Sequence, residues 1–283
     1  DRLSLFLKKH FTSVITALFN LPFTTAEATY LELFNRQEFV KLFSFLYEHD
    51  FVSLPNLRTG RDLAMFTRLN RQGLLEDLER RQIHLASMPG PQQELAEELR
   101  GLTQQLASMS LSAEQRQNLS SKKEKLEKKL YRLLPEIEPR IVEVNQVAYA
   151  IPLDGVLVEY QRYKPIDDSK PGNEEKSNLR YVALILKPSG EIFYKDLGLA
   201  EPIEEKIQQA LRASEEKLAD AQELWNEIGE LVVKPLAKAT AGSTTWFVSP
   251  DAELNRIPFA ALSSPKGDQL LGEAVNLRLL TTG

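Results

Sequence analysis

Cysteine is absent from this sequence of 283 residues, and histidine is scarce. Without a thiol, the chain has no disulfide, no thiolate nucleophile and no cysteine-ligated zinc site. Its three histidines, His10, His49 and His84, all precede the middle of the chain. They lie about 35 residues or more apart, so none has the i, i+4 spacing that places two metal ligands on one helix face. We therefore interpret each histidine as structural, with pH sensing or ligand binding as the alternative.

Long apolar runs and a strong net charge are also missing. No run approaches the roughly 20 apolar residues that a membrane-spanning helix needs, and the start does not have the form of a signal peptide. The formal net charge of -5 argues against bulk capture of nucleic acid. The sequence has no G-x-x-x-x-G-K phosphate loop. We expect a soluble cytoplasmic protein that has no cofactor, no metal, no nucleic acid and no membrane among its partners.

The chain divides near residue 138, and the part before it is predicted to be helical. In residues 1–138 apolar side chains recur every three or four positions, which is typical of amphipathic helices. Residues 91–134 are predicted to form an antiparallel coiled-coil hairpin, with Ser112 and Gln115 spaced as a capping box at the start of its second arm. Its seam is formed by apolar residues at three- and four-residue steps: Leu95, Leu99, Leu102, Leu106, Met109, Leu119, Leu126, Leu130 and Leu133.

A lysine-rich run, residues 122–129, lies mostly outside this seam. Runs of this kind usually form a solvated helix face, which is our interpretation here. A docking surface for a regulatory protein partner is the alternative.

Residues 139–283 alternate between predicted helices and strands. Short helical character at 141–150 is followed by a strand at 155–160 and a hairpin of strands at 181–186 and 192–194. One continuous helical stretch, 202–231, precedes strands at 244–249 and 275–280, and we expect it to cover the sheet. Helices that alternate with strands favour an α/β fold. We expect the strand that contains Trp246 to lie at an edge of the sheet.

The segment from Trp246 to Leu262 is the most distinctive motif. A buried strand ends at Ser249, and a loop set by prolines follows. Asp251 directly follows this strand and Pro250, a place where α/β proteins put functional groups. We interpret its carboxylate as a cap of the turn at 253–261, with a functional role as the alternative. Asn255 is interpreted as a turn residue rather than a substrate contact.

This motif resembles the opening motif of the CHAT family, caspase-like cysteine peptidases that are associated with tetratricopeptide repeats. The family has glycine where this chain has Ala252, from which we predict a different type of turn. Residues 154–160, 181–196 and 271–280 resemble strands of the same family, and residues 70–82 resemble one of its helices. The matched motif positions, which we interpret as structural, are Pro250, Asp251, Leu254, Asn255, Pro258, Phe259 and Leu262.

The resemblance implies that residues 139–283 form the amino-terminal part of a caspase-like α/β domain behind a helical regulatory region, residues 1–138. Residues 1–56 are similar to cyanobacterial members of the family such as the heterocyst-differentiation peptidase. The complete enzyme would use a histidine and cysteine dyad, placed downstream or in a second chain, and would cleave after basic residues. No catalytic, cofactor-binding or metal-binding residue is assigned within this chain.

The partners implied by the resemblance are a protein substrate and the remainder of the protease domain. The alternative function is a non-catalytic interaction scaffold or regulator built on a degenerate CHAT fold.

Overall fold

The computed structural model describes most of the chain, and its residues form two compact units. The first unit comprises Asp1–Lys8, Gln37–Gln72 and Val142–Gly283, and the second comprises Lys9–Arg36 and Gly73–Ile141. The described residues are 2–19, 57–71, 89–90, 92–107, 111–133, 141–165 and 179–280, with single positions at 26, 29, 74, 78, 80, 83, 84 and 87.

The first unit contains a five-stranded mixed sheet in the order β3-β2-β1-β4-β5. Strand β1 pairs antiparallel with β2, which pairs antiparallel with β3, whereas β1, β4 and β5 are parallel. The prediction of a mixed α/β fold is confirmed. The strands are β1 (Gly155–Tyr163), β2 (Arg180–Leu186), β3 (Ile192–Leu199), β4 (Thr245–Ser249) and β5 (Asn276–Leu279).

Strand β4 lies inside the sheet, between β1 and β5, so the prediction of an edge strand at Trp246 is wrong. Trp246 is only 2% exposed. Among the described strands, the edges are formed by β3 and β5. A short apolar strand has the same sequence pattern at either position, because its neighbours come from distant segments.

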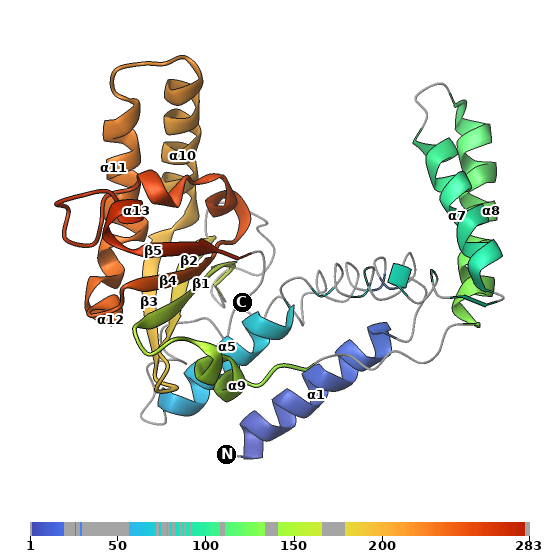
Figure 1. The fold of residues 1–283 in the computed structure, drawn as a ribbon, viewed down its shortest axis with the longest axis horizontal. Helices are drawn as coiled ribbons and strands as arrows, with labels where there is room; N and C mark the ends of the chain where they lie inside the picture. Colours follow the sequence, from blue (N-terminus) through green and yellow to red (C-terminus); the bar gives the residue numbers. More distant parts are fainter. Residues whose placement is uncertain are drawn as a thin grey trace. The chain divides into compact units, whose positions relative to one another are not determined.

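Two helices, α10 (Ala200–Glu215) and α11 (Ala221–Val232), cover one face of the sheet (Figure 1). The sequence predicted one continuous helix here, and the structure shows an antiparallel pair. The break falls at Lys217, which has a left-handed φ of 56°. Its N–H donates to Ser214 O, and the next N–H donates to Ala213 O, which together form a Schellman helix end. Lysine occupies the position where glycine usually marks such an end, so the sequence pattern did not reveal it.

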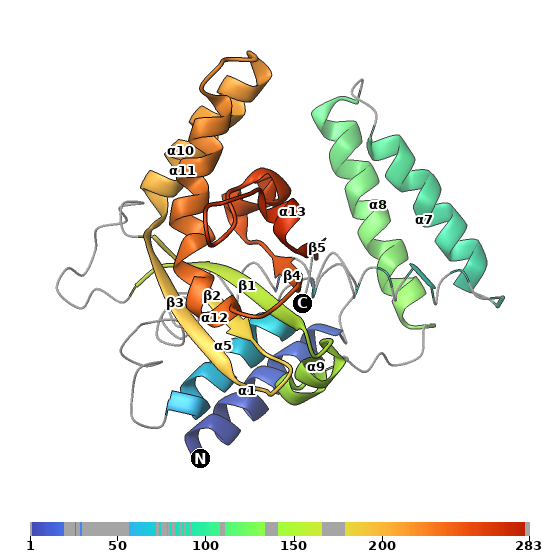
Figure 2. The same cartoon turned by 60° about the vertical axis from the view of Figure 1, so that its left-hand side comes forward.

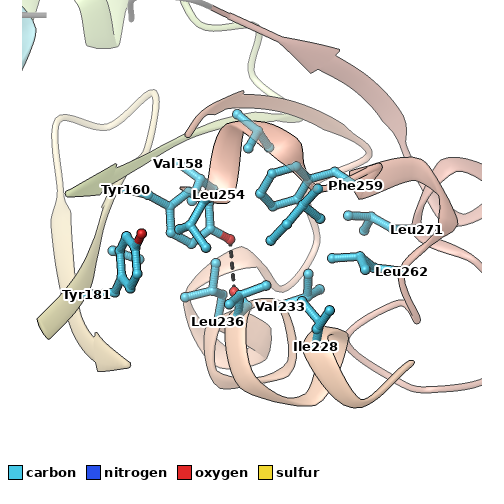
Figure 3. Close-up of a cluster of buried hydrophobic side chains, with 14 of the residues drawn as sticks. Val158, Tyr160, Tyr181, Ile228, Val233, Leu236, Leu254, Phe259, Leu262 and Leu271 are labelled. Atoms are coloured by element: carbon cyan, nitrogen blue, oxygen red, sulfur yellow. Dashed lines mark hydrogen bonds between the residues drawn. The ribbon is translucent and has the colours of Figure 1, made fainter. Parts of the chain in front are cut away.

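The core of the first unit lies between this helix pair and the sheet. Alternate β1 residues, Val156, Val158 and Tyr160, face it because side chains of a strand alternate between its two faces. The Tyr160 hydroxyl donates to Val232 O at 2.8 Å, which satisfies the polar end of an otherwise apolar ring (Figure 3). The predicted motif closes this core with three residues that are at most 1% exposed: Leu254, Phe259 and Leu262.

The opposite face of the sheet is covered by α5 (Leu57–Arg71) and α9 (Val144–Ala150), as Figure 2 shows. Asn70 ties the segment before α9 to α5, because its side chain accepts from Val142 N and donates to Val142 O. The first unit is therefore a three-layer α/β/α arrangement. The buried apolar side chains of α5 are Leu63, Ala64, Met65, Phe66 and Leu69.

The second unit contains the helices α7 (Gln92–Leu106) and α8 (Ala113–Tyr131), which pack against each other. They run antiparallel, because Lys122 pairs with Glu98 at 3.2 Å and Arg116 Nη1 donates to Leu106 O at 2.9 Å. The predicted capping box is present: Gln115 N donates to Ser112 Oγ at 3.2 Å, and Ser112 N donates to Gln115 Oε1 at 2.9 Å.

The leucine seam of this helix pair is shorter than predicted. Leu102, Leu126 and Leu130 are buried, whereas Leu133 is 46% exposed. Leu133 follows the last residue of α8, so no helical turn holds it against α7. Met109 lies outside the described residues.

The remaining described elements are short, apart from α1. They are α1 (Arg2–Phe19), the 3₁₀ helices η2 (Lys234–Leu236), η3 (Ala252–Arg256) and η4 (Phe259–Ala261), and the helices α12 (Ala237–Thr240) and α13 (Leu271–Ala274). Across the part of the chain that the structure describes, no helix combines the length and apolar character needed to cross a bilayer.

Replacing Leu102 or Leu126 by aspartate should open the α7–α8 pair. Each substitution would bury a carboxylate without a partner, which costs several kcal/mol. Amide hydrogen exchange across 92–131 should accelerate in both variants. The matched control, Gln105→Asp, places the same charge at an exposed position of α7 and should leave exchange unchanged. Equal exchange in all three variants would contradict a packed seam.

Candidate functional site

The candidate site lies where β1 and the parallel strand β4 end, at the carboxyl edge of the sheet. In open α/β sheets this edge is the usual place for ligands and functional groups. Residues from three elements meet there: α5, the end of β1 and the turn after β4. We call this group the carboxyl-edge cluster; it consists of Arg68, Glu159, Gln161, Ser249 and Asp251.

Arg68 belongs to α5 and is the centre of the cluster. Its side chain is buried between this helix and the sheet. Its side chain is 2% exposed, and that of Glu159 is fully buried. The guanidinium Nε donates to Glu159 Oε2 at 3.0 Å, and Nη1 donates to Gln161 Oε1 at 3.3 Å. Glu159 and Gln161 are two residues apart on β1, so both side chains project from the face that α5 covers.

The same guanidinium also reaches the end of β4. Its Nη2 donates to Pro250 O at 3.1 Å and more weakly to Ser249 Oγ at 3.5 Å. Asp251 Oδ1 lies 3.6 Å from Nη1, within ion-pair distance. One arginine thus joins both parallel strands, using the planar fork that makes arginine suited to several acceptors at once.

Two carboxylates share this single guanidinium, and they differ in environment. Burial raises the pKa of Glu159, and the charge of Arg68 opposes that rise. Its Oε1 accepts no hydrogen bond from the described residues. Asp251 is less enclosed, with a side chain that is 20% exposed. Arg68 therefore stabilises the ionised form of Glu159 against the effect of burial.

Asp251 does not cap the turn that follows it, contrary to the prediction. Its side chain makes no capping bond to η3. Instead, Oδ2 accepts from Arg162 N at 2.7 Å and from Gln161 Nε2 at 2.9 Å. The carboxylate therefore fixes the end of β1. The sequence could not indicate this partner, because β1 lies about 90 positions earlier.

The turn after Asp251 is left-handed at Ala252, whose φ is 49°. A left-handed φ is the conformation that favours glycine, and the different turn type expected from the resemblance stays a prediction. Glycine adopts this left-handed conformation without strain. For alanine, it costs roughly 1–2 kcal/mol. Asn255, predicted as a turn residue, donates from Nδ2 to Ala252 O at 3.0 Å.

Polar contacts continue from Asp251 to the other face of the sheet. Arg162, whose N–H binds Asp251, donates from Nη1 to Glu204 Oε1 at 3.0 Å. The Tyr181 hydroxyl donates to the same oxygen at 2.8 Å. Glu204 belongs to α10, so contacts across the carboxyl edge reach helices on both faces of the sheet.

The polar side chains of the cluster bond to one another and to the ends of the strands. Its only hydroxyl, that of Ser249, belongs to a residue with no exposed surface and contacts Arg68. Among the described histidines, His10 and His84 are exposed, and His49 lies outside the described residues. The described parts of the chain contain no group of three histidine, aspartate or glutamate residues arranged to hold a metal ion.

A separate surface groove of about 640 Å³ lies between α5, α9 and the turn that joins β2 to β3. Its lining includes Asp62, Tyr149 and Glu191. Asp62 pairs with Lys8 at 2.8 Å, and the same ammonium pairs with Glu143 at 3.2 Å. The groove contains none of the residues predicted from the motif.

Sequence reasoning missed both partners of the buried ion pair. Glu159 carried the available signal, because it stands within the apolar run of β1. A carboxylate that is buried there is almost never without a partner, so its position predicts a buried cation. Arg68 carried a weaker signal: it lies two residues after the apolar run from Leu63 to Phe66.

A scan of the chain against models of known protein families finds no match, and a search of curated proteins finds none either. The resemblance to the CHAT family is carried by the residues of the sequence.

Replacing Arg68 by methionine should destabilise the first unit by about 3–5 kcal/mol at neutral pH, because Glu159 would remain buried without its cation. A raised pKa in the folded state means that the stabilising contribution of Glu159 is complete at low pH and is lost as pH rises. Removing Arg68 raises that pKa further. The difference in free energy of unfolding between the parent chain and the variant should therefore shrink towards pH 4.5. Urea unfolding measures this difference.

The control for this experiment is the double variant Arg68→Met/Glu159→Gln. It removes both charges and should recover part of the stability at neutral pH, without the pH-dependent deficit. A deficit of the single variant that stays constant between pH 4.5 and 8 would contradict a charged pair.

Replacing Ala252 by glycine should stabilise the first unit by roughly 0.5–1 kcal/mol, because the relief of left-handed strain exceeds the entropy cost of glycine. Thermal unfolding measures this gain. Ala260→Gly is the control: Ala260 is exposed and has no left-handed φ, so glycine should not stabilise there. Loss of stability in Ala252→Gly would argue against strain at this turn.

Proposed function

We propose that this chain is the amino-terminal part of a CHAT-type, caspase-like cysteine endopeptidase. In this proposal, the three-layer unit is the first part of the protease sheet, and the α7–α8 pair is a coiled-coil hairpin in a regulatory region. The observation that carries the proposal is the arrangement of the motif. Parallel strands β4 and β5 flank the segment from Pro250 to Leu262, and its apolar residues close the core.

The chemistry of such an enzyme must come from residues outside this chain. A histidine and cysteine dyad in the remainder of the domain would supply the base and the thiolate that attacks the peptide carbonyl. Backbone amides would stabilise the resulting oxyanion. The substrate would be a regulatory protein cleaved after a basic residue, in the cytoplasm.

Strand β5 supports a continuation of the sheet beyond the described residues. It is an edge strand among them, and Leu279 on it is 57% exposed. Exposed apolar edge strands tend to pair with further chain. We infer that the remainder of the protease domain adds its next strand at β5, either in the same polypeptide or from a second one.

The second candidate function is a non-catalytic scaffold or regulator on a degenerate CHAT fold. One observation favours it: residues 139–283 contain neither cysteine nor histidine. The exposed lysines of α8, such as Lys125 and Lys129, would then belong to a docking face for a protein partner.

The chain by itself should be inert as a cysteine peptidase. Peptides that contain arginine or lysine should be hydrolysed at background rate, and iodoacetamide should have no effect because no thiol is present. Fluorogenic substrates measure this rate, with a caspase-like peptidase as the positive control. Turnover by pure material that is sensitive to alkylation would overturn the assignment.

The gene downstream of the codon for Gly283 separates the two functions. A histidine and a cysteine in a continuation of the sheet, together with thiol-dependent cleavage of basic peptides by the longer polypeptide, support the peptidase. A continuation without that dyad, inactive in the same assay, supports the scaffold.

A further inference from the structure

The contacts of Arg68 extend from a helix on one face of the sheet to the turn that begins the motif. Arg68 belongs to α5, and the groups it contacts on the far side of the cluster are Ser249, Pro250 and Asp251. These residues are 181 or more positions away in the sequence. The guanidinium is buried, so its hydrogen bonds are not exchanged for bonds to bulk water.

The turn is held by local hydrogen bonds and by contacts from distant segments. Asp251 makes no side-chain bond to η3, and Ala252 is left-handed without being glycine. A residue held in such a conformation persists only where the surrounding structure determines it. Local bonds contribute, because Leu254 N donates to Asp251 O and Asn255 Nδ2 donates to Ala252 O. The contacts from distant segments are the bond from Arg68 to Pro250 O and the bonds of Asp251 to the end of β1.

We propose that Arg68 is a positioning residue through which α5 fixes the conformation of the turn Ser249–Ala252. The helix is an integral part of this arrangement, because five of its apolar side chains are buried. A change in the packing of α5 is therefore transmitted to the carboxyl edge of the sheet, where a ligand or substrate would meet β4. The proposal holds for a peptidase and for a scaffold alike.

Two hydrogen bonds report directly on the turn. Leu254 N donates to Asp251 O at 3.1 Å, and Ile257 N donates to Leu254 O at 3.1 Å. Local opening of the turn exposes these two amides to exchange, whereas global unfolding exposes them together with the amides of β2. The ratio of the two rates separates a positioning role from a merely stabilising one.

The experiment compares amide exchange in the full chain and in Arg68→Met, with Leu63→Ala as the matched control. Leu63 lies on α5 and is 2% exposed, but its side chain has no polar group to offer the turn. In Arg68→Met, the Leu254 and Ile257 amides should exchange about tenfold faster relative to the amides of β2. In Leu63→Ala, the exchange of the turn amides and of the β2 amides should accelerate by the same factor. Equal acceleration of both sets in Arg68→Met overturns the proposal.

Arg68→Lys provides a second arm if Arg68→Met does not fold. Lysine keeps the positive charge beside Glu159 but lacks the fork that reaches both strands. The Leu254 amide should again exchange faster relative to β2 than it does in Leu63→Ala. A folded Arg68→Lys chain in which the turn exchanges as in the parent would also overturn the proposal.

Discussion

The buried pairing of Arg68 with Glu159 is the interaction on which the arrangement of the first unit depends. A carboxylate in the middle strand of a sheet is costly to bury, and only a cation held at hydrogen-bond distance offsets that cost. The pairing therefore requires α5 to lie over β1 at one register. Because the same guanidinium binds the end of β4, the position of the helix and the junction of two parallel strands are fixed together.

Asp251 extends this constraint across the sheet. One oxygen of its carboxylate pairs with the guanidinium of Arg68, and the other accepts from the backbone of β1. The side chain of Arg162 in turn donates to Glu204 on α10. Both helical layers are thus connected at the edge where α/β proteins place their sites. The strain at Ala252 lies next to this connection, which fits the general observation that strained backbone persists where tertiary contacts determine it.

The arrangement suits both functions that we consider. A peptidase needs a rigid support beside the strands that carry its catalytic groups, since small displacements of those groups lower the reaction rate. A scaffold needs an edge with a fixed shape. In either case, the side chains of the carboxyl-edge cluster are bonded to one another, although Oε1 of Glu159 accepts no hydrogen bond from the described residues. In the proposed peptidase, the thiol would come from the remainder of the domain, because this chain has no cysteine.

The sequence by itself determined the local elements and several of their ends. Alternation and apolar runs located the five described strands, although β3 extends five residues beyond the predicted end at 194. The capping box at Ser112 marked the start of α8. Both signals depend on neighbouring residues alone. The sequence also shows that this chain has no thiol. The break between α10 and α11 was missed because Lys217 adopts the conformation typical of glycine.

The tertiary structure alone decided the neighbours of each element and the composition of the site. The order of strands placed β4 inside the sheet, and α5 joined the first unit although the sequence grouped it with the other helices. Asp251 was correctly singled out from its place after a strand, but its partners were not. Arg68, Glu159 and Asp251 are separated by about 90 residues each, and no local pattern encodes a contact whose free energy arises only when three distant segments exclude water together.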